Sequence, residues 1–324
     1  MLTSDFDFHL PPERIASQPP ADRAASRMLV VHRATGQLEH RQFLDLPAYI
    51  QPGDEWVLND TRVIPARYFP EGGGREILRL TAPTPTRWRC MVKPGKKFRL
   101  GAIVHLGSAT GTVAGIEENG DRWIEWDQPV DEERHGHLAL PHYMGRPDNS
   151  TDRQRYQTVF AREPGSIAAP TAGLHFTPDI LAQLPHSFVT LHVGVGTFQP
   201  VRTDRVEDHV MHAETYEIPA DTATRIRAAR RVVAVGTTAL RTLETVAAQP
   251  GGIRATTGST DIFIYPGYTF RCVQALLTNF HLPKSTLLML VSAFSDRDLI
   301  LHAYAEAVRE DYRFFSYGDC MLIL

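Results

Sequence analysis

The segment RVVAVGTTALRTLETVA, residues 231–247, decides the fold class of this chain. Residues 231–235 are expected to form a strand, and from Val232 onwards they are all apolar, which is typical of a strand that is buried on both faces of a sheet. Gly236, Thr237 and Thr238 then lead into a stretch with apolar residues at helical spacing. A strand that passes through a short glycine turn into a helix is the building unit of α/β proteins.

The same two textures alternate over the second half of the chain. Residues 188–193 are strand-like, residues 222–229 are helical, and residues 298–308 repeat apolar side chains at helical spacing. The alternation predicts one α/β framework rather than separate all-α and all-β regions.

A different texture separates the two ends of this framework. Short alternating segments follow one another at residues 75–80, 88–92, 102–106, 111–116 and 123–126. Asn119-Gly120 between the last two predicts a two-residue hairpin, because both residues tolerate a positive φ. We therefore expect an α/β (α+β) fold. Residues 1–67 and 141–324 are expected to form an α/β catalytic domain, and residues 68–140 an inserted small antiparallel β-barrel domain.

Composition favours an enzyme that acts in the cytoplasm. The chain carries 34 basic and 37 acidic residues, a net charge of −3, so a polyanion can be bound only by local clusters of Lys and Arg. Three widely separated cysteines offer neither a disulfide framework nor a metal-binding pair. The start of the chain lacks a basic, then apolar, leader, and the longest apolar run, residues 287–291, is too short to cross a bilayer.

Polar side chains cluster where the predicted strands end. Asn59, Asp60 and Arg62 follow a buried-type strand, and Arg67 comes shortly after. Loops at strand ends are where α/β sheets bind ligands. The alternative is an ordinary turn in which Asp60 pairs with Arg62 or Arg67.

A run of small residues, GSIAAPTAGLHF at 165–176, has the composition of a binding loop because small side chains let the backbone approach a ligand. It includes Thr171 and ends near His175, a candidate acid or base, although a lone histidine is more often structural. Thr237 and Thr238 suggest a small-ligand cradle with a threonine capping the helix; a plain helix cap is the alternative.

Histidines accompany the remaining polar loops. His192 ends a strand, and His209, His212 and Glu214 have a spacing that three metal ligands can have. The helical His-Glu-x-x-His arrangement is absent, so a metal-dependent hydrolase remains only an alternative. Two further polar loops lie nearer the C-terminus; they contain Asn279 and His281, and Arg313. Several such loops in one α/β framework favour an enzyme over a scaffold.

Taken together, these segments resemble the S-adenosylmethionine:tRNA ribosyltransferase-isomerase family of queuosine biosynthesis. The resemblance runs from Phe6 to the last residue and is weakest over residues 72–126; Cys320 stands where a small residue such as alanine is expected. The segments that carry it are NDTRVIPAR from Asn59, YQTVFA from Tyr156, GSIAAPTAGLHFT from Gly165, LHVGVGTFQPV from Leu191, HVMHAE from His209, AVGTTALRTLE from Ala234, TNFHLPKSTLLMLVSAF from Thr278 and YRFFSYGDCMLIL from Tyr312.

The resemblance implies a reaction in which S-adenosylmethionine donates its ribosyl group to 7-aminomethyl-7-deazaguanine in the anticodon loop of a tRNA. The ribosyl unit is isomerised to an epoxy-cyclopentane, giving epoxyqueuosine, and adenine and methionine leave. S-adenosylmethionine is then a substrate, no cofactor is permanently bound and no metal is needed, because the sulfonium acidifies the adjacent carbon. The implied protein is a cytoplasmic monomer that acts without a membrane.

Residue chemistry suggests roles at the matching positions. His175, His212 and His281 are candidates for the proton transfers, with Glu214 beside His212. Asp60 and Glu244 are expected to balance the sulfonium, and Arg62 or Arg67 to hold the methionine carboxylate. The other residues expected to bind substrate are Asn59, Thr171, His192, Thr197, Thr237, Thr238, Asn279 and Arg313. We expect His175, His212 and His281 to converge on a single pocket.

Locally basic segments are the only candidates for contacts with tRNA. Lys93, Lys96 and Lys97 lie in the predicted barrel, and Arg146 and Arg153 lie where the chain returns from it. We expect them to line a groove between the domains that holds anticodon phosphates. The alternative for each is an ordinary solvated charge, and a non-catalytic tRNA-binding module is a further alternative for the whole chain.

Overall fold

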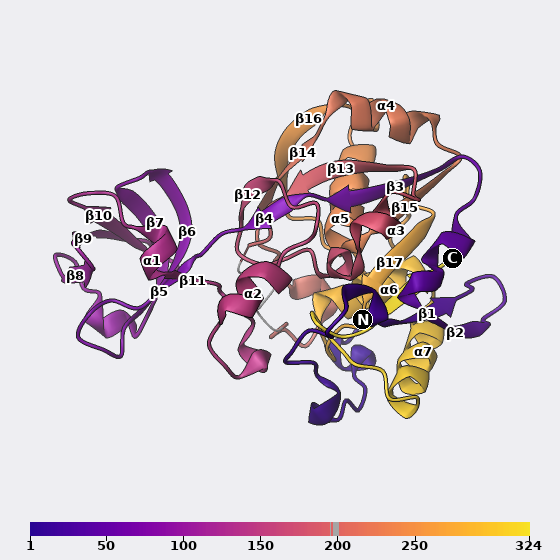
Figure 1. Ribbon diagram of the computed structural model, residues 1–324, viewed down its shortest axis with the longest axis horizontal. Coiled ribbons are helices and arrows are strands. Elements are labelled where there is room, and N and C mark those ends of the chain that lie inside the picture. Colours follow the sequence, from indigo (N-terminus) through magenta and orange to yellow (C-terminus); the bar gives the residue numbers. More distant parts are fainter. Residues whose placement is uncertain (195, 197–200) are drawn as a thin grey trace. The chain divides into compact units, whose positions relative to one another are not determined.

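The structure is a computed structural model that describes residues 1–194, 196 and 201–324 (Figure 1). Within it the chain divides into two compact units. The first unit comprises Met1–Arg62, His142–Arg146 and Gln154–Leu324, and the second comprises Val63–Pro141 and Pro147–Arg153. Both ends of the chain therefore contribute to the first unit.

A nine-stranded sheet forms the framework of the first unit, in the order β16-β14-β13-β3-β15-β17-β18-β1-β2 (Figure 1). Strands β13, β3, β15 and β17 run parallel to one another, whereas β18 is antiparallel to β17 and parallel to β1. The strands are β1 Arg27–Val31, β2 Leu38–Gln42, β3 Asp54–Asn59, β13 His186–Leu191, β14 Glu214–Ile218, β15 Arg231–Val235, β16 Thr256–Thr260, β17 Ala275–Asn279 and β18 Cys320–Ile323.

The central strands are buried on both faces, as the apolar run at residues 232–235 predicts. Ala234 packs in the cluster that includes the apolar side chains of α5, while Val233 and Val235 pack on the opposite face against the cluster containing Phe176. The helices and short helical turns of the first unit are α3 Pro178–Leu181, α4 Ala220–Ala228, α5 Gly236–Ala247, α6 Thr286–Phe294, α7 Arg297–Arg309, η1 Thr3–Phe6, η2 Pro12–Arg14, η3 Arg23–Ala25, η4 Phe43–Tyr49, η6 His142–Met144, η7 Thr171–His175 and η9 Val206–Asp208.

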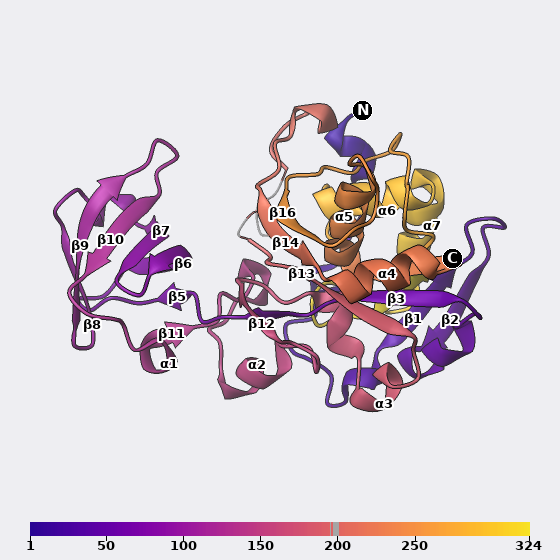
Figure 2. The same cartoon turned by 90° about the horizontal axis from the view of Figure 1, so that it is seen from above.

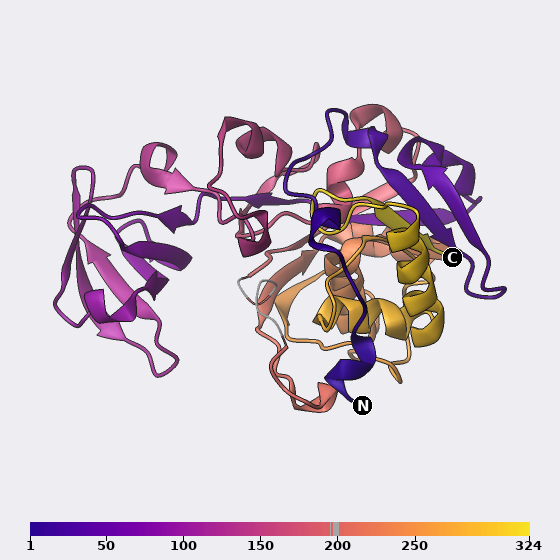
Figure 3. The same ribbon diagram turned by 90° about the horizontal axis from the view of Figure 1, so that it is seen from below.

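Helices cover both faces of this sheet and give the first unit its layers. Helices α5, α6 and α7 contribute side chains to one large core, and α6 and α7 lie against each other (yellow in Figure 3). On the other face, η4, η7 and α3 contribute to a second core. Short strands β4 Thr61–Val63 and β12 Glu163–Ser166 form a separate two-stranded sheet, and helix α2 spans Ser150–Arg155.

The second unit is built on a seven-stranded sheet in the order β11-β5-β6-β7-β10-β9-β8, in which each pair of neighbouring strands is antiparallel. It curls around a core that includes Tyr68, Trp88 and Ile124, and forms a half-barrel (Figure 2). The predicted fold class is confirmed. The elements are β5 Arg67–Tyr68, β6 Glu76–Thr84, β7 Arg87–Lys93, η5 Gly95–Lys97, β8 Ile103–Leu106, β9 Ala109–Ile116, β10 Arg122–Trp126, α1 Glu132–His135 and β11 Gly136–His137.

The predicted two-residue hairpin at Asn119-Gly120 is wrong. β9 ends at Ile116 and β10 begins at Arg122, so the connection is longer, and only Gly120 of the pair has a positive φ, +91°. The side chain of Asn119 instead accepts a hydrogen bond from the N–H of Asp121 at 3.0 Å, which favours an Asx turn over a type I′ turn.

None of the helices in the described part of the chain is long and apolar enough to cross a membrane.

Candidate active site at the carboxyl edge of the parallel strands

Four parallel strands bring the predicted polar loops to one edge of the sheet. β3, β13, β15 and β17 end at Asn59, Leu191, Val235 and Asn279, and parallel strands end at the same edge. The pairing of Asn279 with Cys320 brings the start of β18 to this edge as well. The topology therefore gathers loops from both ends of the chain at one place.

A pocket of about 610 Å³ opens at this edge, and we call it the strand-end pocket. Its described lining contains no Asp, Glu, Lys or Arg side chain. That lining consists of Tyr156, Ala168, Ala169, Pro170, Thr171, Ala172, Val193, Gly236, Thr237, Thr238, Thr278, Asn279, Phe280, His281, Leu287, Phe315 and Ser316. Five predicted site residues thus line one pocket, namely Thr171, Thr237, Thr238, Asn279 and His281.

Helix α5 presents its N-terminus to the strand-end pocket. Gly236 begins the helix with φ +87°, a conformation that a side chain would strain. The expected threonine cap is wrong: the N-cap residue is Val235, which makes no side-chain cap bond. The Oγ1 of Thr238 is buried and has no hydrogen-bond partner among the described residues. The first turn of α5 therefore offers a free hydroxyl and the helix N-terminus as possible hydrogen-bonding groups for a ligand.

His281 is the titratable imidazole of the strand-end pocket. Its side chain is 5% exposed, and its Nε2 lies 3.0 Å from the Oγ1 of Thr278. The backbone N–H of His281 donates to the hydroxyl of Tyr304 at 3.0 Å, which fixes the residue at the end of β17. Burial lowers the pKa of His281 to about 3. The ring is therefore neutral at pH 7 and can accept a proton.

His175 lies beside this pocket in a buried chain of hydrogen bonds. Its Nε2 is 3.2 Å from the Oδ1 of Asn279, and its Nδ1 is 2.9 Å from the Oγ of Ser26. The Nδ2 of Asn279 donates to the carbonyls of Phe315 and Ser316, so its Oδ1 must accept from His175. This assigns the proton of the neutral ring to Nε2 and makes Ser26 the donor to Nδ1.

Burial also keeps His175 neutral. Desolvation is the main cause that lowers its pKa to about 4, and the nearby positive charges of Arg313 and Arg23 lower it further. His175 lines a small neighbouring pocket of about 230 Å³, which shares Ser316 with the strand-end pocket. Arg313 is itself held by its own loop, because its Nη2 donates to the carbonyl of Tyr317 at 2.6 Å.

His212 and Glu214 line a third pocket of about 490 Å³, which we call the Arg241 pocket. The Oε1 of Glu214 accepts the N–H of Gly194 at 2.9 Å, and its Oε2 lies 2.5 Å from the Nη1 of Arg241. Leu287 lines both this pocket and the strand-end pocket. The three histidines expected in one cavity thus line three different pockets, which are neighbours through shared lining residues.

In the described ranges, no group of three or more His, Cys, Asp and Glu side chains has an arrangement that could hold a metal ion. His209, His212 and Glu214, the trio that the sequence singles out, therefore do not form such a group.

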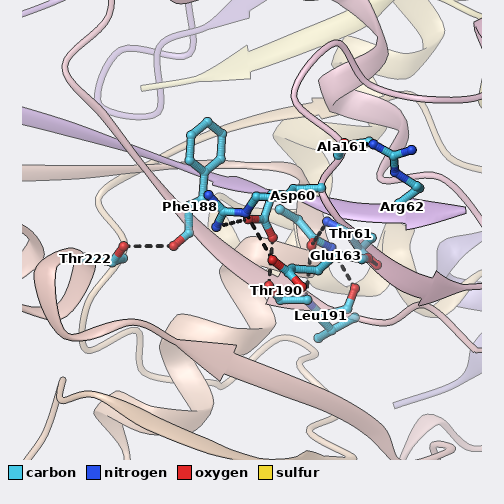
Figure 4. Close-up of polar contacts among 11 residues, drawn as sticks. Asp60, Thr61, Arg62, Ala161, Glu163, Phe188, Thr190, Leu191 and Thr222 are labelled. Carbon is cyan, nitrogen blue, oxygen red and sulfur yellow. Dashed lines mark hydrogen bonds and ion pairs between the residues drawn. The ribbon is translucent and has the colours of Figure 1, made fainter.

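Asn59 and Asp60 act within the fold at the end of β3. The amide of Asn59 donates to the carbonyl of Leu191 at 2.9 Å and accepts its N–H at 3.0 Å, which ties β3 to β13. Asp60 accepts a hydrogen bond from the hydroxyl of Thr190 at 2.7 Å (Figure 4). It also pairs with Arg162 at 2.7 Å. Burial nevertheless raises the pKa of Asp60. Neither residue belongs to the described lining of the strand-end pocket.

His192 and Arg62 have partners in the same region. The Nδ1 of His192 lies 2.8 Å from the Oγ1 of Thr61, and burial lowers the pKa of the ring. The exposed Arg62 donates to the carbonyl of Ala161 at 2.9 Å (Figure 4). Both side chains are thus held beside the strand end and outside the described lining of the strand-end pocket.

The remaining predicted substrate residues lie elsewhere. Glu244 is fully buried, and its carboxylate accepts the N–H groups of residues 271–273 at 2.8–3.0 Å, so it holds that loop rather than facing the pocket. Arg67 belongs to the second unit, where its Nε pairs with Glu76 at 2.9 Å. Thr197 lies outside the described residues.

With this geometry in place, comparison with known proteins decides the family. The family model described as "Queuosine biosynthesis protein" matches residues 3–323. The chain belongs to the queuosine biosynthesis protein family. This confirms the family predicted from the sequence motifs.

Relatives in this family are similar over their whole length. The chain is 52% identical to the S-adenosylmethionine:tRNA ribosyltransferase-isomerase of Symbiobacterium thermophilum, and the alignment covers 100% of both chains. It is 50% identical to the protein of the same name from Moorella thermoacetica, again over 100% of both. A crystal structure of S-adenosylmethionine tRNA ribosyltransferase from Thermotoga maritima is similar with a TM-score of 0.58 and 38% identity, covering 99% of this chain and 100% of that one.

Sequence reasoning missed two residues that lie in or beside these pockets. Arg241 is 3% exposed in the Arg241 pocket, and Ser26 is the buried hydroxyl that fixes the ring of His175. An arginine inside the apolar helix pattern of residues 239–247 is a signal that could have identified Arg241, because a buried guanidinium needs a partner. Ser26 offers no such signal, since its partner is distant in the sequence.

The predicted tRNA contacts divide between the two units. Lys93, Lys96, Lys97 and Arg153 are exposed residues of the second unit. Arg153 also donates to the carbonyl of Gly136 at 2.7 Å. Arg146 belongs to the first unit, where its Nη2 donates to the carbonyl of Ser17 at 3.1 Å.

Proposed function

We propose that the chain transfers the ribosyl part of S-adenosylmethionine to 7-aminomethyl-7-deazaguanine in a tRNA and isomerises it, giving epoxyqueuosine with release of adenine and methionine. The family match and the names of the relatives support the ribosyltransferase-isomerase activity expected from the sequence. The finer assignments are also proposals: no permanently bound cofactor, this modified base as the acceptor, and a cytoplasmic monomer.

The strand-end pocket is the observation that carries this proposal. It lies at the carboxyl ends of the parallel strands, where α/β sheets bind their ligands. Its small residues Ala168, Ala169 and Ala172 leave room for a flat base and a sugar, while Thr237 and Thr238 offer hydroxyls to them. The pocket therefore suits the adenosyl part of S-adenosylmethionine.

The same lining suits a sulfonium cation. The described lining carries no positive side chain to repel it, because His281 is neutral at pH 7. Tyr156, Phe280 and Phe315 supply aromatic rings, whose faces attract cations. These rings take the place of Asp60 and Glu244, the carboxylates expected from the sequence to balance this charge.

His281 is the proton-transfer group in this proposal. Its Nε2 is held by Thr278, while its Nδ1 makes no hydrogen bond with the described residues, so one ring nitrogen remains for the substrate. A neutral imidazole can take the proton from the carbon next to the sulfonium. The low pKa makes His281 a weak base, so this step depends on the acidity that the sulfonium gives to the carbon, and it makes the imidazolium a strong acid that passes the proton on to the leaving adenine.

His175 has a positioning role in this proposal. Both of its ring nitrogens are engaged, by Ser26 and by Asn279, and it does not belong to the described lining of the strand-end pocket. Through Asn279 it holds the carbonyls of the 315–316 loop, which lines the pocket. Loss of His175 is therefore expected to affect substrate binding as well as turnover.

The test is release of free adenine from S-adenosylmethionine in the presence of tRNA that carries 7-aminomethyl-7-deazaguanine. The wild-type protein is expected to release adenine only with this tRNA. His281→Gln is expected to lower kcat by about 10²- to 10⁴-fold with little change in KM, the usual contribution of a proton-transfer group. His175→Gln is expected to change KM and kcat together.

The exposed His302 on α7 supplies a matched control, because His302→Gln removes an imidazole of the same unit without touching a pocket described above. Its kinetics are expected to equal those of the wild type. No adenine release by the wild-type protein would refute the proposed reaction. Full activity of His281→Gln would refute only the role of His281.

A further inference from the structure

The Arg241 pocket contains two buried charged groups that the proton transfers do not use. Arg241 is 3% exposed and Glu214 is 6% exposed, and they come from α5 and from the start of β14. Removing a charged pair from water costs several kcal/mol for each ion unless good hydrogen bonds compensate. The pair therefore needs a physical reason for its position beside the strand-end pocket.

The hydrogen bonds that would compensate for this cost are incomplete. The Nη1 of Arg241 and the Oε2 of Glu214 are in contact at 2.5 Å, but they are not aligned as a hydrogen bond. The Nε of Arg241 has no hydrogen-bond acceptor in the described part of the chain either. Among the described residues, the Nε of Arg241 thus has no acceptor, and the ion pair with Glu214 leaves both buried groups without an aligned hydrogen bond in the lining of one pocket.

This arrangement is complementary to an amino-acid zwitterion. A ligand carboxylate can accept two parallel hydrogen bonds from a guanidinium, and a ligand ammonium can donate to a carboxylate. A simple anion would use Arg241 alone and would offer no hydrogen-bond donor to the Oε2 of Glu214. The apolar side chains of Val210, Met211 and Leu287 in the same lining suit a short hydrocarbon chain.

The position of the pocket connects it to the proposed adenosyl site. Leu287 lines both pockets, and Thr238 and Arg241 lie three residues apart on α5. Residues at this spacing lie on the same side of a helix, with about 5–6 Å between their Cβ atoms. That separation matches the length of the three-carbon chain that joins the carboxylate of S-adenosylmethionine to its sulfur.

We propose that Arg241 and Glu214 bind the amino-acid end of S-adenosylmethionine, with the carboxylate on Arg241 and the ammonium on Glu214. This inference rests on the proposed function. In this assignment Arg241, and not Arg62 or Arg67 as expected from the sequence, binds the carboxylate. Arg241 lines the pocket next to the strand-end pocket, and its Nε has no acceptor among the described residues. The adenosyl part then occupies the strand-end pocket, and Leu287 contacts the chain between the two ends.

The test compares S-adenosylmethionine with decarboxylated S-adenosylmethionine, which keeps the sulfonium and the ammonium but lacks the carboxylate. Their Kd values are measured by calorimetry with the wild-type protein and with Arg241→Met. The wild type is expected to bind the decarboxylated ligand about 10- to 100-fold more weakly, the usual effect of charge-assisted hydrogen bonds. Arg241→Met is expected to weaken S-adenosylmethionine by a similar factor and to leave the Kd of the decarboxylated ligand unchanged.

Two controls keep the result specific. Arg309→Met replaces an exposed arginine on α7 and is expected to bind both ligands as the wild type does. Thr237→Val, in the strand-end pocket, is expected to weaken both ligands by the same factor. If Arg241→Met does not fold, equal affinity of the wild type for the two ligands would still overturn the inference.

Equal affinity of the wild type for the two ligands would overturn this inference, as would equal weakening of both by Arg241→Met. If adenine is still released from S-adenosylmethionine by the wild type in that case, the proposed function stands and only the assignment of Arg241 and Glu214 fails. If the wild type neither binds S-adenosylmethionine nor releases adenine, the proposed function itself fails.

Discussion

Acidification is predicted to destabilise the first unit through two buried histidines. Burial lowers the pKa of His175 from 6.5 to about 4 and that of His281 from 6.5 to about 3. Between these values and 6.5 the unfolded chain binds more protons than the folded one, so stability falls as the pH falls. Above pH 6.5 both states are neutral at these positions, and the contribution is fully present.

The magnitude follows from the two pKa values. One pKa unit corresponds to about 1.4 kcal/mol, so complete protonation would cost on the order of 3 kcal/mol through His175 and 5 kcal/mol through His281. Between pH 6.5 and 4.5 each histidine is expected to remove about 2 kcal/mol. Since whole domains are stable by only about 5–15 kcal/mol, the combined loss is measurable.

The assay is urea unfolding at pH values from 7 to 4.5, applied to wild type, His175→Gln and His281→Gln. Burial raises the pKa values of Asp60 and Asp319, which changes stability in the opposite direction, so the difference between wild type and variant is the relevant quantity. On acidification, the free energy of unfolding of the wild type is expected to fall relative to that of each variant by about 1.4 kcal/mol per pH unit. Flat curves for both buried histidines would refute the reasoning.

Two further predictions concern the tRNA contact and the sheet. Replacing both Lys96 and Lys97 by Gln is expected to weaken tRNA binding and to flatten its dependence on salt, as measured by filter binding. Each lost phosphate contact lowers the slope of log binding constant against log salt concentration by about 0.7–0.9. An unchanged slope would show that neither lysine contacts the tRNA. Asn59→Leu is expected to lower the free energy of unfolding by about 2–4 kcal/mol, because backbone groups of Leu191 and Thr61 lose their buried hydrogen-bond partner. A loss below about 1 kcal/mol in urea unfolding would contradict this prediction.

The framework of the fold was predictable because its signals are local. The apolar run at residues 232–235 and the polar residues after β3 and β17 mark buried strands and their ends, and parallel strands bring those ends together without knowledge of any contact. A place in the strand-end pocket could therefore be inferred for Thr237, Thr238 and His281. The hairpin at Asn119 was not predictable from the dipeptide alone, because a side-chain hydrogen bond within the loop selects another turn.

The roles of individual residues depend on partners that are distant in the sequence. The motifs do not identify those partners, so the roles could not be predicted from them. Asp60 finds Arg162, and Glu244 finds the N–H groups of residues 271–273, so each carboxylate proposed for the sulfonium is already engaged within the fold. Arg241 was overlooked for the converse reason. It looks like one polar position of a helix, and only the packing shows that it is buried and that its Nε has no hydrogen-bond acceptor among the described residues.

A crystal structure of the protein with bound S-adenosylmethionine is the measurement that tests these proposals most directly. The predicted result places the adenosyl group in the strand-end pocket beside Thr238 and His281, with the carboxylate within hydrogen-bonding distance of Arg241. Well-defined density for the ligand at a different place, with the strand-end pocket empty, would contradict the proposed site.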